Sequence, residues 1–78
     1  MDMTDKNGNV SVGMELRLLR TQKEASMREV AEFLGVSENF ISLVERNKKI
    51  PSDDVIKQIA KYYMLDEGYL FGRFGKIP

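Results

Sequence analysis

The amino-acid sequence predicts an all-α fold, a bundle of five helices joined by short connections. Apolar residues recur three and four positions apart in several segments, which places them on one side of an α-helix. Residues that cap or end helices separate these segments. No segment alternates polar and apolar residues as an amphipathic strand does, so we expect no β-sheet. A chain of 78 residues can bury one small core, which the five helices must share.

The first two predicted helices are indicated by their N-caps. One spans about residues 12–23 with Ser11 as its cap, and the next begins after Ser26. Ser26 and Glu29 have the spacing of a capping box, in which each side chain accepts a hydrogen bond from the backbone N–H of the other residue. We expect the core-facing residues to be Val12, Leu16 and Leu19 in the first helix and Val30, Ala31, Phe33 and Leu34 in the second.

The segment Met27–Arg46 contains the most informative pattern of the chain. Gly35 stands where a residue with positive φ commonly ends a helix, and Ser37 can cap a third helix over residues 38–46. The inward face of that helix carries Ile41 and Val44. Two helices joined in this way form a helix-turn-helix, whose second helix can lie in the major groove of DNA. The alternative is a helical hairpin whose apolar residues serve only as core.

The rest of the chain predicts two more helices. Asn47 follows the third helix at a position where a left-handed residue commonly ends a helix, and asparagine tolerates that conformation. Ser52 is the expected N-cap of a fourth helix over residues 53–63. A last short helix, residues 67–71, is expected to end at Gly72.

We divide the chain into three parts. Residues 1–10 have no hydrophobic periodicity and are expected to be disordered. Residues 11–72 form the folded domain, and residues 73–78 form a tail. Large apolar residues crowd the last helix and the tail, among them Tyr69, Leu70, Phe71 and Phe74. These residues serve as a dimer contact, close the core, or lead into a further domain.

Composition excludes several classes of protein. The chain has no cysteine for a disulfide or a thiolate metal site, and no histidine, the commonest general base and metal ligand. No grouping of the remaining side chains suggests an enzyme active site, and we expect no cofactor and no metal. No apolar run approaches the ~20 residues that span a bilayer, and the polar start is unlike a signal peptide. We therefore expect a cytoplasmic protein without a membrane partner.

The distribution of charge matters more than its sum. Twelve basic residues balance 12 acidic ones, which argues mildly against DNA binding because phosphate contacts supply much of its affinity. Three cations nevertheless follow the third helix directly, namely Arg46, Lys48 and Lys49. Acidic residues lie in segments that can face elsewhere, namely Asp2, Asp5, Asp53, Asp54, Asp66 and Glu67. A neutral domain polarised in this way can bind nucleic acid, although more weakly than a basic one.

Four motifs between Leu16 and Leu70 have a characteristic order. They are Leu-x-x-x-Arg in the first helix, Glu-x-Ala-x-x-x-Gly-Val-Ser across the turn, Ile-Ser-x-x-Glu-Arg in the third helix, and Pro51-Ser52 before the fourth. In these motifs the chain resembles the phage-repressor, or Cro-type, helix-turn-helix regulators, also called the xenobiotic-response-element family. The resemblance implies a lambda-repressor-like DNA-binding domain. Members are typically bacterial or phage transcriptional regulators that bind palindromic operators as dimers.

The resemblance implies roles for the matching positions. The base-reading residues would be Glu38, Asn39, Ser42 and Leu43. Contacts to the DNA backbone would come from Ser26, Met27, Arg28, Ser37, Phe40, Arg46, Asn47, Lys48 and Lys49. Met27 departs from the family pattern, which usually has a backbone-contacting glutamine there. Arg20 and Glu45 match an ion pair between the first and third helices, and with Gly35 they would be structural. The last helix would pair two copies through Tyr69, Leu70, Phe71 and Phe74.

The chemistry of the third helix suits base reading. Asn39 can form a bidentate pair with adenine, Ser42 can bond several base edges, and Leu43 can pack on a thymine methyl group. Glu38 either accepts a hydrogen bond from cytosine or only places a favourable charge at a helix N-terminus. Phe40 and Leu43 lie off the inward face, so we expect them to contact DNA or a protein.

These inferences predict a sequence-specific transcriptional regulator, most simply a repressor. It would bind a palindromic operator in double-stranded DNA as a homodimer. The alternative is a protein-interaction module, such as an antirepressor or a regulatory subunit, that uses Phe40 and Leu43 to bind a protein partner. We do not expect enzymatic activity.

Overall fold

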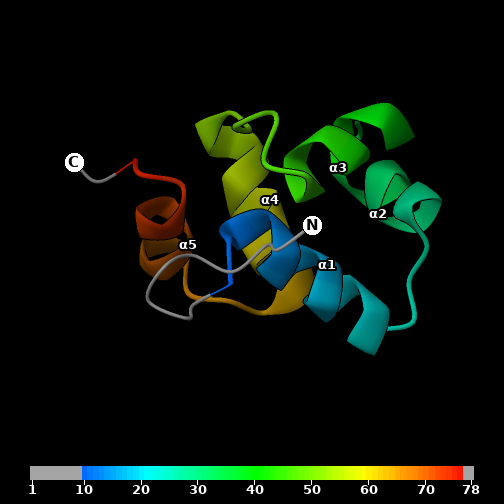
Figure 1. Ribbon diagram of the computed structural model, residues 1–78, viewed down its shortest axis with the longest axis horizontal. Helices are drawn as coiled ribbons and strands as arrows, with labels where there is room; N and C mark the ends of the chain where they lie inside the picture. The colour runs from blue at the N-terminus through cyan, green and yellow to red at the C-terminus, as the bar shows by residue number, and fades with distance from the viewer. Residues whose placement is uncertain (1–9, 77–78) are drawn as a thin grey trace.

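The computed structural model describes residues 10–76 and contains five helices (Figure 1). They are α1 (Val12–Gln22), α2 (Met27–Leu34), α3 (Glu38–Glu45), α4 (Asp53–Tyr63) and α5 (Glu67–Arg73). No strand occurs between residues 10 and 76, and the all-α prediction is confirmed. The pair α2 and α3 lies at one end of the long axis and α5 at the other, with α1 and α4 between them (Figure 1).

Each helix begins at a side chain that caps its N-terminus. The caps are Ser11, Ser26, Ser37, Ser52 and Asp66. Each cap oxygen accepts a hydrogen bond from the backbone N–H group three residues later. These bonds satisfy N–H groups that have no partner within a helix, which is why the helices begin where the sequence predicts them. The predicted capping box is confirmed, because the Ser26 backbone N–H also donates to Glu29 Oε1 at 2.8 Å.

Residues with positive φ end several helices. Gly35 follows α2 with a φ of 72° and Asn47 follows α3 with a φ of 61°, as the sequence predicts. The last helix is longer than predicted. Gly72 lies inside α5, and the left-handed turn comes at Gly75, which has a φ of 75°. The side chain of Phe74, at the end of α5, is buried, so packing favours the longer helix.

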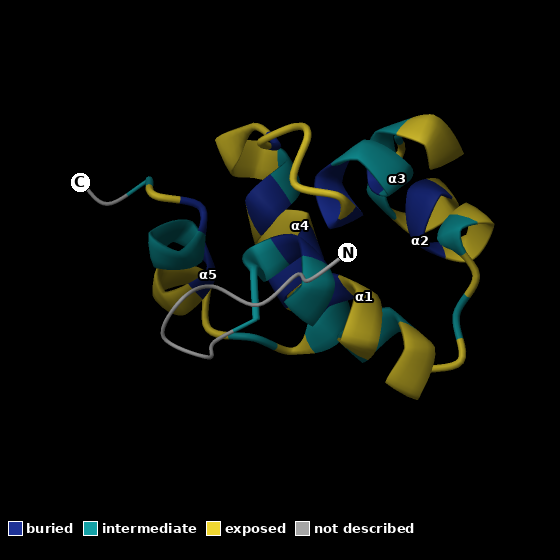
Figure 2. Ribbon diagram, in the orientation of Figure 1, coloured by how far each residue is buried: buried dark blue, intermediate teal, exposed yellow. Residues whose placement is uncertain are grey.

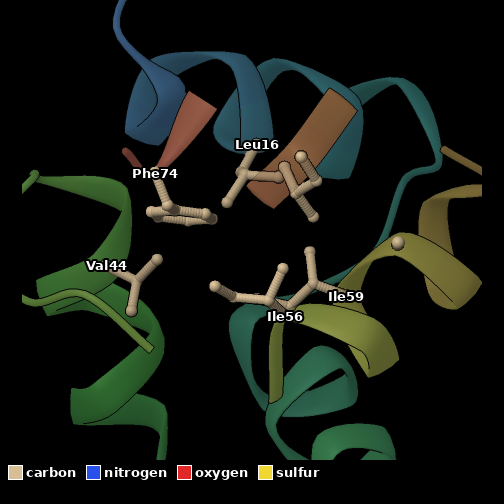
Figure 3. Close-up of a cluster of buried hydrophobic side chains, with 7 residues drawn as sticks. Leu16, Val44, Ile56, Ile59 and Phe74 are labelled. Carbon is tan, nitrogen blue, oxygen red and sulfur yellow. The ribbon is translucent and has the colours of Figure 1, made fainter. Parts of the chain in front are cut away.

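The core consists of two clusters of buried side chains. The larger joins α1, α3, α4 and α5 and contains Leu16, Val44, Ile56, Ile59, Ala60, Leu70 and Phe74. Figure 2 shows the buried residues on the facing sides of the helices, and Figure 3 shows five labelled members of this cluster pointing toward one another. The smaller cluster joins α2 to α3 through Val30, Ala31 and Ile41. Burying a Val, Leu or Ile side chain stabilises a fold by roughly 1.5–3 kcal/mol, so these clusters fix α3 against its neighbours.

Burial corrects the expectations for several apolar residues. Phe33 is 48% exposed, so it is not a core residue, and its ring lies 4.9 Å from that of Tyr62. The predicted dimer contacts are Tyr69, Leu70, Phe71 and Phe74. Leu70 and Phe74 close the core, with exposures of 0% and 9%, so a second copy cannot reach them without opening the domain. Phe71 packs partly buried against the same core, and Tyr69 is 47% exposed.

Residues 73–76 of the predicted tail are tied to the bundle. Lys76 Nζ donates to the Pro51 carbonyl oxygen at 2.7 Å and lies 3.0 Å from Asp53 Oδ1. Arg73 Nε lies 2.9 Å from Glu15 Oε1. The predicted disordered segment lies outside the described residues except for Val10, as do residues 77–78 of the tail.

Candidate nucleic-acid interface

The packing of α2 against α3 depends on a turn at Gly35. Its backbone is left-handed, with φ 72° and ψ 33°. No atom lies within 4 Å of the position that a Cβ would take, so there is room for a side chain. Glycine is favoured here because of the left-handed backbone. Val30 and Ala31 of α2 then meet Ile41 of α3 in the smaller cluster. The two helices therefore form the predicted helix-turn-helix.

The four predicted base-reading residues lie on one accessible side of α3. Glu38 and Asn39 in its first turn are exposed, and Ser42 and Leu43 one turn later are partly exposed. The other side is buried and consists of Ile41, Val44 and Glu45. Figure 2 shows α3 changing from exposed at its start to buried at its end. We call the surface of Glu38, Asn39, Ser42 and Leu43 the outer face of α3.

Phe40 connects the two core clusters. Its side chain is partly buried and packs against both of them. Lys49 Nζ lies 5.7 Å from the centre of its ring. The expectation that Phe40 lies off the core-facing side of α3 is therefore corrected, because its ring packs against both clusters, whereas a contact of its remaining exposed surface with DNA or a protein stays a prediction.

Exposed cations flank the outer face of α3. Arg28 lies on α2 with its Nε atom 4.0 Å from Glu38 Oε2. Arg46, Lys48 and Lys49 follow α3 and are also exposed. The side chains of Arg28 and Glu38 are 76% and 59% exposed, so their pairing contributes little stability and they can separate at small cost. Four exposed cations can thus turn toward a bound anion.

The remaining predicted backbone contacts differ in environment. Ser26 and Ser37 are exposed caps whose hydroxyl oxygens each accept one backbone N–H. Each hydroxyl keeps its own O–H group to donate. Met27 is partly buried and packs against the smaller cluster, so its side chain belongs to the packing of the domain.

Arg20 and Glu45 form the ion pair that the resemblance implies. Arg20 Nε lies 2.7 Å from Glu45 Oε2, and a second guanidinium nitrogen donates to Oε1 at 3.1 Å. A third nitrogen donates to the Ala25 carbonyl oxygen at 3.0 Å. The hydrogen bond to Glu45 is the largest cause that raises the pKa of Arg20 above its ordinary value. The pair ties α1 to the buried side of α3.

Asn47 was predicted to contact phosphate, but its side-chain amide bonds within the domain. Oδ1 accepts a hydrogen bond from the Gly13 backbone N–H at 3.0 Å, and Nδ2 donates to Ser11 Oγ at 2.9 Å. A Cβ on Gly13 would lie only 2.4 Å from the Glu45 carbonyl oxygen. Sequence reasoning missed this contact. A signal was present, because glycine in a helix is unfavourable by about 1 kcal/mol relative to alanine and so indicates a close approach.

Two further findings bear on the kind of ligand. Within residues 10–76, no group of three or more His, Cys, Asp and Glu side chains could hold a metal ion. In the same range, no helix is both long enough and apolar enough to cross a bilayer. The outer face of α3 and its flanking cations offer amide, hydroxyl, carboxylate, guanidinium and ammonium groups, which are the groups that recognise bases and phosphates.

Comparison with known sequences places the chain in a family. Residues 11–68 match the helix-turn-helix domain family. The chain is also similar to two proteins from two strains of Mycobacterium tuberculosis, each described as an uncharacterized HTH-type transcriptional regulator. Each is 41% identical to it over 63 residues, which are 81% of this chain and 45% of the relative. The chain therefore spans less than half the length of these curated relatives.

Solved structures show the same architecture. The clp gene regulator ClgR from Corynebacterium glutamicum aligns with a TM-score of 0.69 and 25% identity over 82% of this chain and 68% of its own. SinR, described as the master regulator for biofilm formation and solved in complex with DNA, aligns with a TM-score of 0.67 and 26% identity over 77% of this chain and 97% of its own. The matched family, the curated relatives and the shared fold agree with the motifs in the sequence. The chain belongs to the helix-turn-helix family of Cro-type transcriptional regulators.

Proposed function

We propose that this domain binds double-stranded DNA sequence-specifically, with the outer face of α3 in the major groove. The observation that carries the proposal is that this face is accessible and flanked by Arg28 on one side and Arg46, Lys48 and Lys49 on the other. Its opposite face is packed into both core clusters, so α3 is presented as a rigid element. The solved structure of SinR in complex with DNA supports the same use of the fold.

The residues of the interface divide into readers and anchors. Asn39 reads adenine, and Ser42 and Leu43 contact neighbouring base edges and methyl groups. Glu38 accepts from a cytosine amino group when Arg28 leaves it for a phosphate, since their 4.0 Å pairing is weak. The anchors are Arg28, Arg46, Lys48 and Lys49, with the hydroxyl groups of Ser26 and Ser37 as neutral donors to phosphate.

Selection of binding sites from random duplexes tests this proposal. We expect enrichment of a defined sequence, with affinity that falls as salt is raised. Lys48→Ala and Lys49→Ala should weaken binding to all duplexes and each reduce the salt slope by about 0.9. Asn39→Ala should instead relax the preference at one base pair by about 1–3 kcal/mol. If no sequence is enriched and a protein partner is captured through Leu43, a protein-interaction module replaces this proposal.

We propose further that the protein binds a palindromic operator as a homodimer. Leu18 and Tyr69 are both 47% exposed. The Tyr69 hydroxyl donates to Glu15, and Leu18 lies one turn after Glu15 on the same side of α1, so we place the dimer contact on this side of α1 and α5. Two copies joined there must place their α3 helices ~34 Å apart, one turn of DNA.

Sedimentation tests the dimer. Wild-type protein should associate at micromolar concentration, and Leu18→Glu should return it to monomer. Met64→Glu is the matched control, since Met64 is 90% exposed at the end of α4 and lies outside this surface. A wild-type protein that remains monomeric at high micromolar concentration, both free and on a palindromic duplex, rejects the dimer.

We also propose that binding represses transcription, because a domain seated in the groove excludes other proteins from the same base pairs. A reporter gene with the selected sequence in its promoter should lose expression when the protein is present. Increased expression would instead identify the protein as an activator and contradict repression.

A further inference from the structure

We infer that Asn47 is a positioning residue. By hydrogen bonding to the start of α1, it orients the basic segment after α3, which contains Lys48 and Lys49. The inference rests on the proposed DNA-binding function. It gives Asn47 a role different from the direct phosphate contact that the sequence suggests, because both polar atoms of its side chain have partners inside the domain.

The clasp consists of Ser11, Gly13 and Asn47. Asn47 Oδ1 accepts the Gly13 N–H at 3.0 Å, which is one of the N–H groups at the start of α1 that lack a partner within the helix. Asn47 Nδ2 donates to Ser11 Oγ at 2.9 Å, and the same oxygen accepts the Met14 N–H at 3.1 Å. One side chain therefore joins the cap of α1 to the turn that follows α3.

Close contact at Gly13 makes the clasp rigid. A Cβ at this position would lie 2.4 Å from the Glu45 carbonyl oxygen and 2.7 Å from Asn47 Oδ1, so only glycine allows α1 to approach the end of α3 this closely. Arg20, farther along α1, binds the Glu45 side chain at 2.7 Å. The helix α1 thus holds the end of α3 at two separate points.

The direction in which the chain leaves α3 depends on Asn47. Its φ of 61° turns the backbone so that the Lys48 N–H donates to the Leu43 carbonyl oxygen at 2.8 Å. Lys48 and Lys49 extend from this turn, and their long side chains carry no fixed orientation of their own. Without the amide bonds to Ser11 and Gly13, the turn can move relative to α1, and its lysines lose their alignment with phosphates.

Salt dependence separates positioning from direct contact. Asn47→Gly keeps a residue that readily adopts the left-handed turn and removes the clasp. We expect about fivefold to tenfold weaker binding to the selected duplex, and a salt slope reduced by about 0.9, because one lysine contact is no longer held. Ser11→Ala, which removes only the Nδ2 bond, should change binding and salt slope in the same direction but by less, and Ser11→Thr, which keeps the hydroxyl, should bind like wild type. Weaker binding with an unchanged slope would indicate a neutral contact from Asn47 to phosphate and would overturn the inference, as would wild-type binding by both variants.

Amide hydrogen exchange tests the clasp without DNA. In the free protein, the Gly13 N–H should exchange at least about tenfold faster in Asn47→Gly than in wild type, because it loses its acceptor. A thermal melt of each variant verifies that the domain remains folded. Unchanged exchange at Gly13 would show that the clasp does not form and would overturn the inference. Failure to select any duplex would instead reject the proposed DNA-binding function.

Discussion

Removing the Glu45 carboxylate measures how strongly α1 holds the recognition helix. The Glu45 side chain is 4% exposed and that of Arg20 is 14% exposed, and two hydrogen bonds of 2.7 and 3.1 Å join them. Glu45→Ala deletes both bonds and leaves the guanidinium with its bond to the Ala25 carbonyl oxygen. Breaking a buried pair by removing one partner is unfavourable by about 3–5 kcal/mol, because the other charge is stranded. The residual exposure of Arg20 lets water reach it, so we expect about 3 kcal/mol, at the lower end of that range.

A loss of this size is easily measured in so small a domain. In a protein of 60–100 residues, 1 kcal/mol corresponds to about 4–8 °C, so the melting temperature of Glu45→Ala should fall by about 12–24 °C. Lys48→Ala, at an exposed position of the neighbouring segment, is the control and should change stability by less than about 0.5 kcal/mol. Circular dichroism during thermal and urea denaturation gives both numbers.

The double variant Arg20→Leu/Glu45→Leu separates the stranded charge from the loss of contacts. It should be more stable than Glu45→Ala, because no unpaired charge remains near the core. Equal melting temperatures for Glu45→Ala and Lys48→Ala would refute the structural role of the pair. A double variant no more stable than Glu45→Ala would refute the stranded-charge explanation.

Three other changes test separate parts of the fold. Gly13→Ala should destabilise the domain by about 1–3 kcal/mol in urea denaturation, because its Cβ would lie 2.4 Å from a backbone oxygen, whereas Gly68→Ala at an exposed position of α5 should change stability far less. Ser26→Ala should reduce stability by about 1 kcal/mol through loss of the cap of α2, and Ser26→Thr should retain most of it. Burial, followed by the nearby Glu45 carboxylate, raises the pKa of Tyr63 above 10.0. Above pH 10 the folded state therefore holds the Tyr63 proton that the unfolded state releases. The contribution of this group to the free energy of unfolding is fully present below about pH 10 and decreases above it. In denaturation curves from pH 9 to 11, the free energy of unfolding should fall less steeply with pH in Tyr63→Phe than in wild type. Unchanged stability in Gly13→Ala or Ser26→Ala would contradict the close contact at Gly13 or the cap at Ser26. An unchanged dependence on alkaline pH in Tyr63→Phe would contradict the raised pKa of Tyr63.

Most of the helices could be predicted from the sequence because local hydrogen bonds and backbone preferences set where they begin. Each N-cap bonds an N–H three residues away, and Gly35 ends α2 by its own backbone preference, so both signals lie within one turn of the chain. The ends of helices are harder to predict. Gly72 is a strong local stop signal, but the burial of Leu70 and Phe74 in the shared core extends α5 past it.

Tertiary neighbours decided what the sequence could not predict. Phe33 has the spacing of a core residue, yet its position opposite Tyr62 leaves it at the surface. Asn47 fits a phosphate contact by its place after α3, but the start of α1, far away in the chain, takes up its amide. The outer face of α3 was predictable because helical periodicity fixes which residues point away from Ile41 and Val44.

Titration of the isotope-labelled protein with the selected duplex, monitored by its backbone amide chemical shifts, shows directly which residues of the domain contact DNA. We predict that the largest shift changes fall on the outer face of α3 and on Arg46, Lys48 and Lys49, and that α5 changes little. Shift changes centred instead on the ring pair of Phe33 and Tyr62, with Asn39 and Ser42 unaffected, would contradict the placement of α3 in the groove.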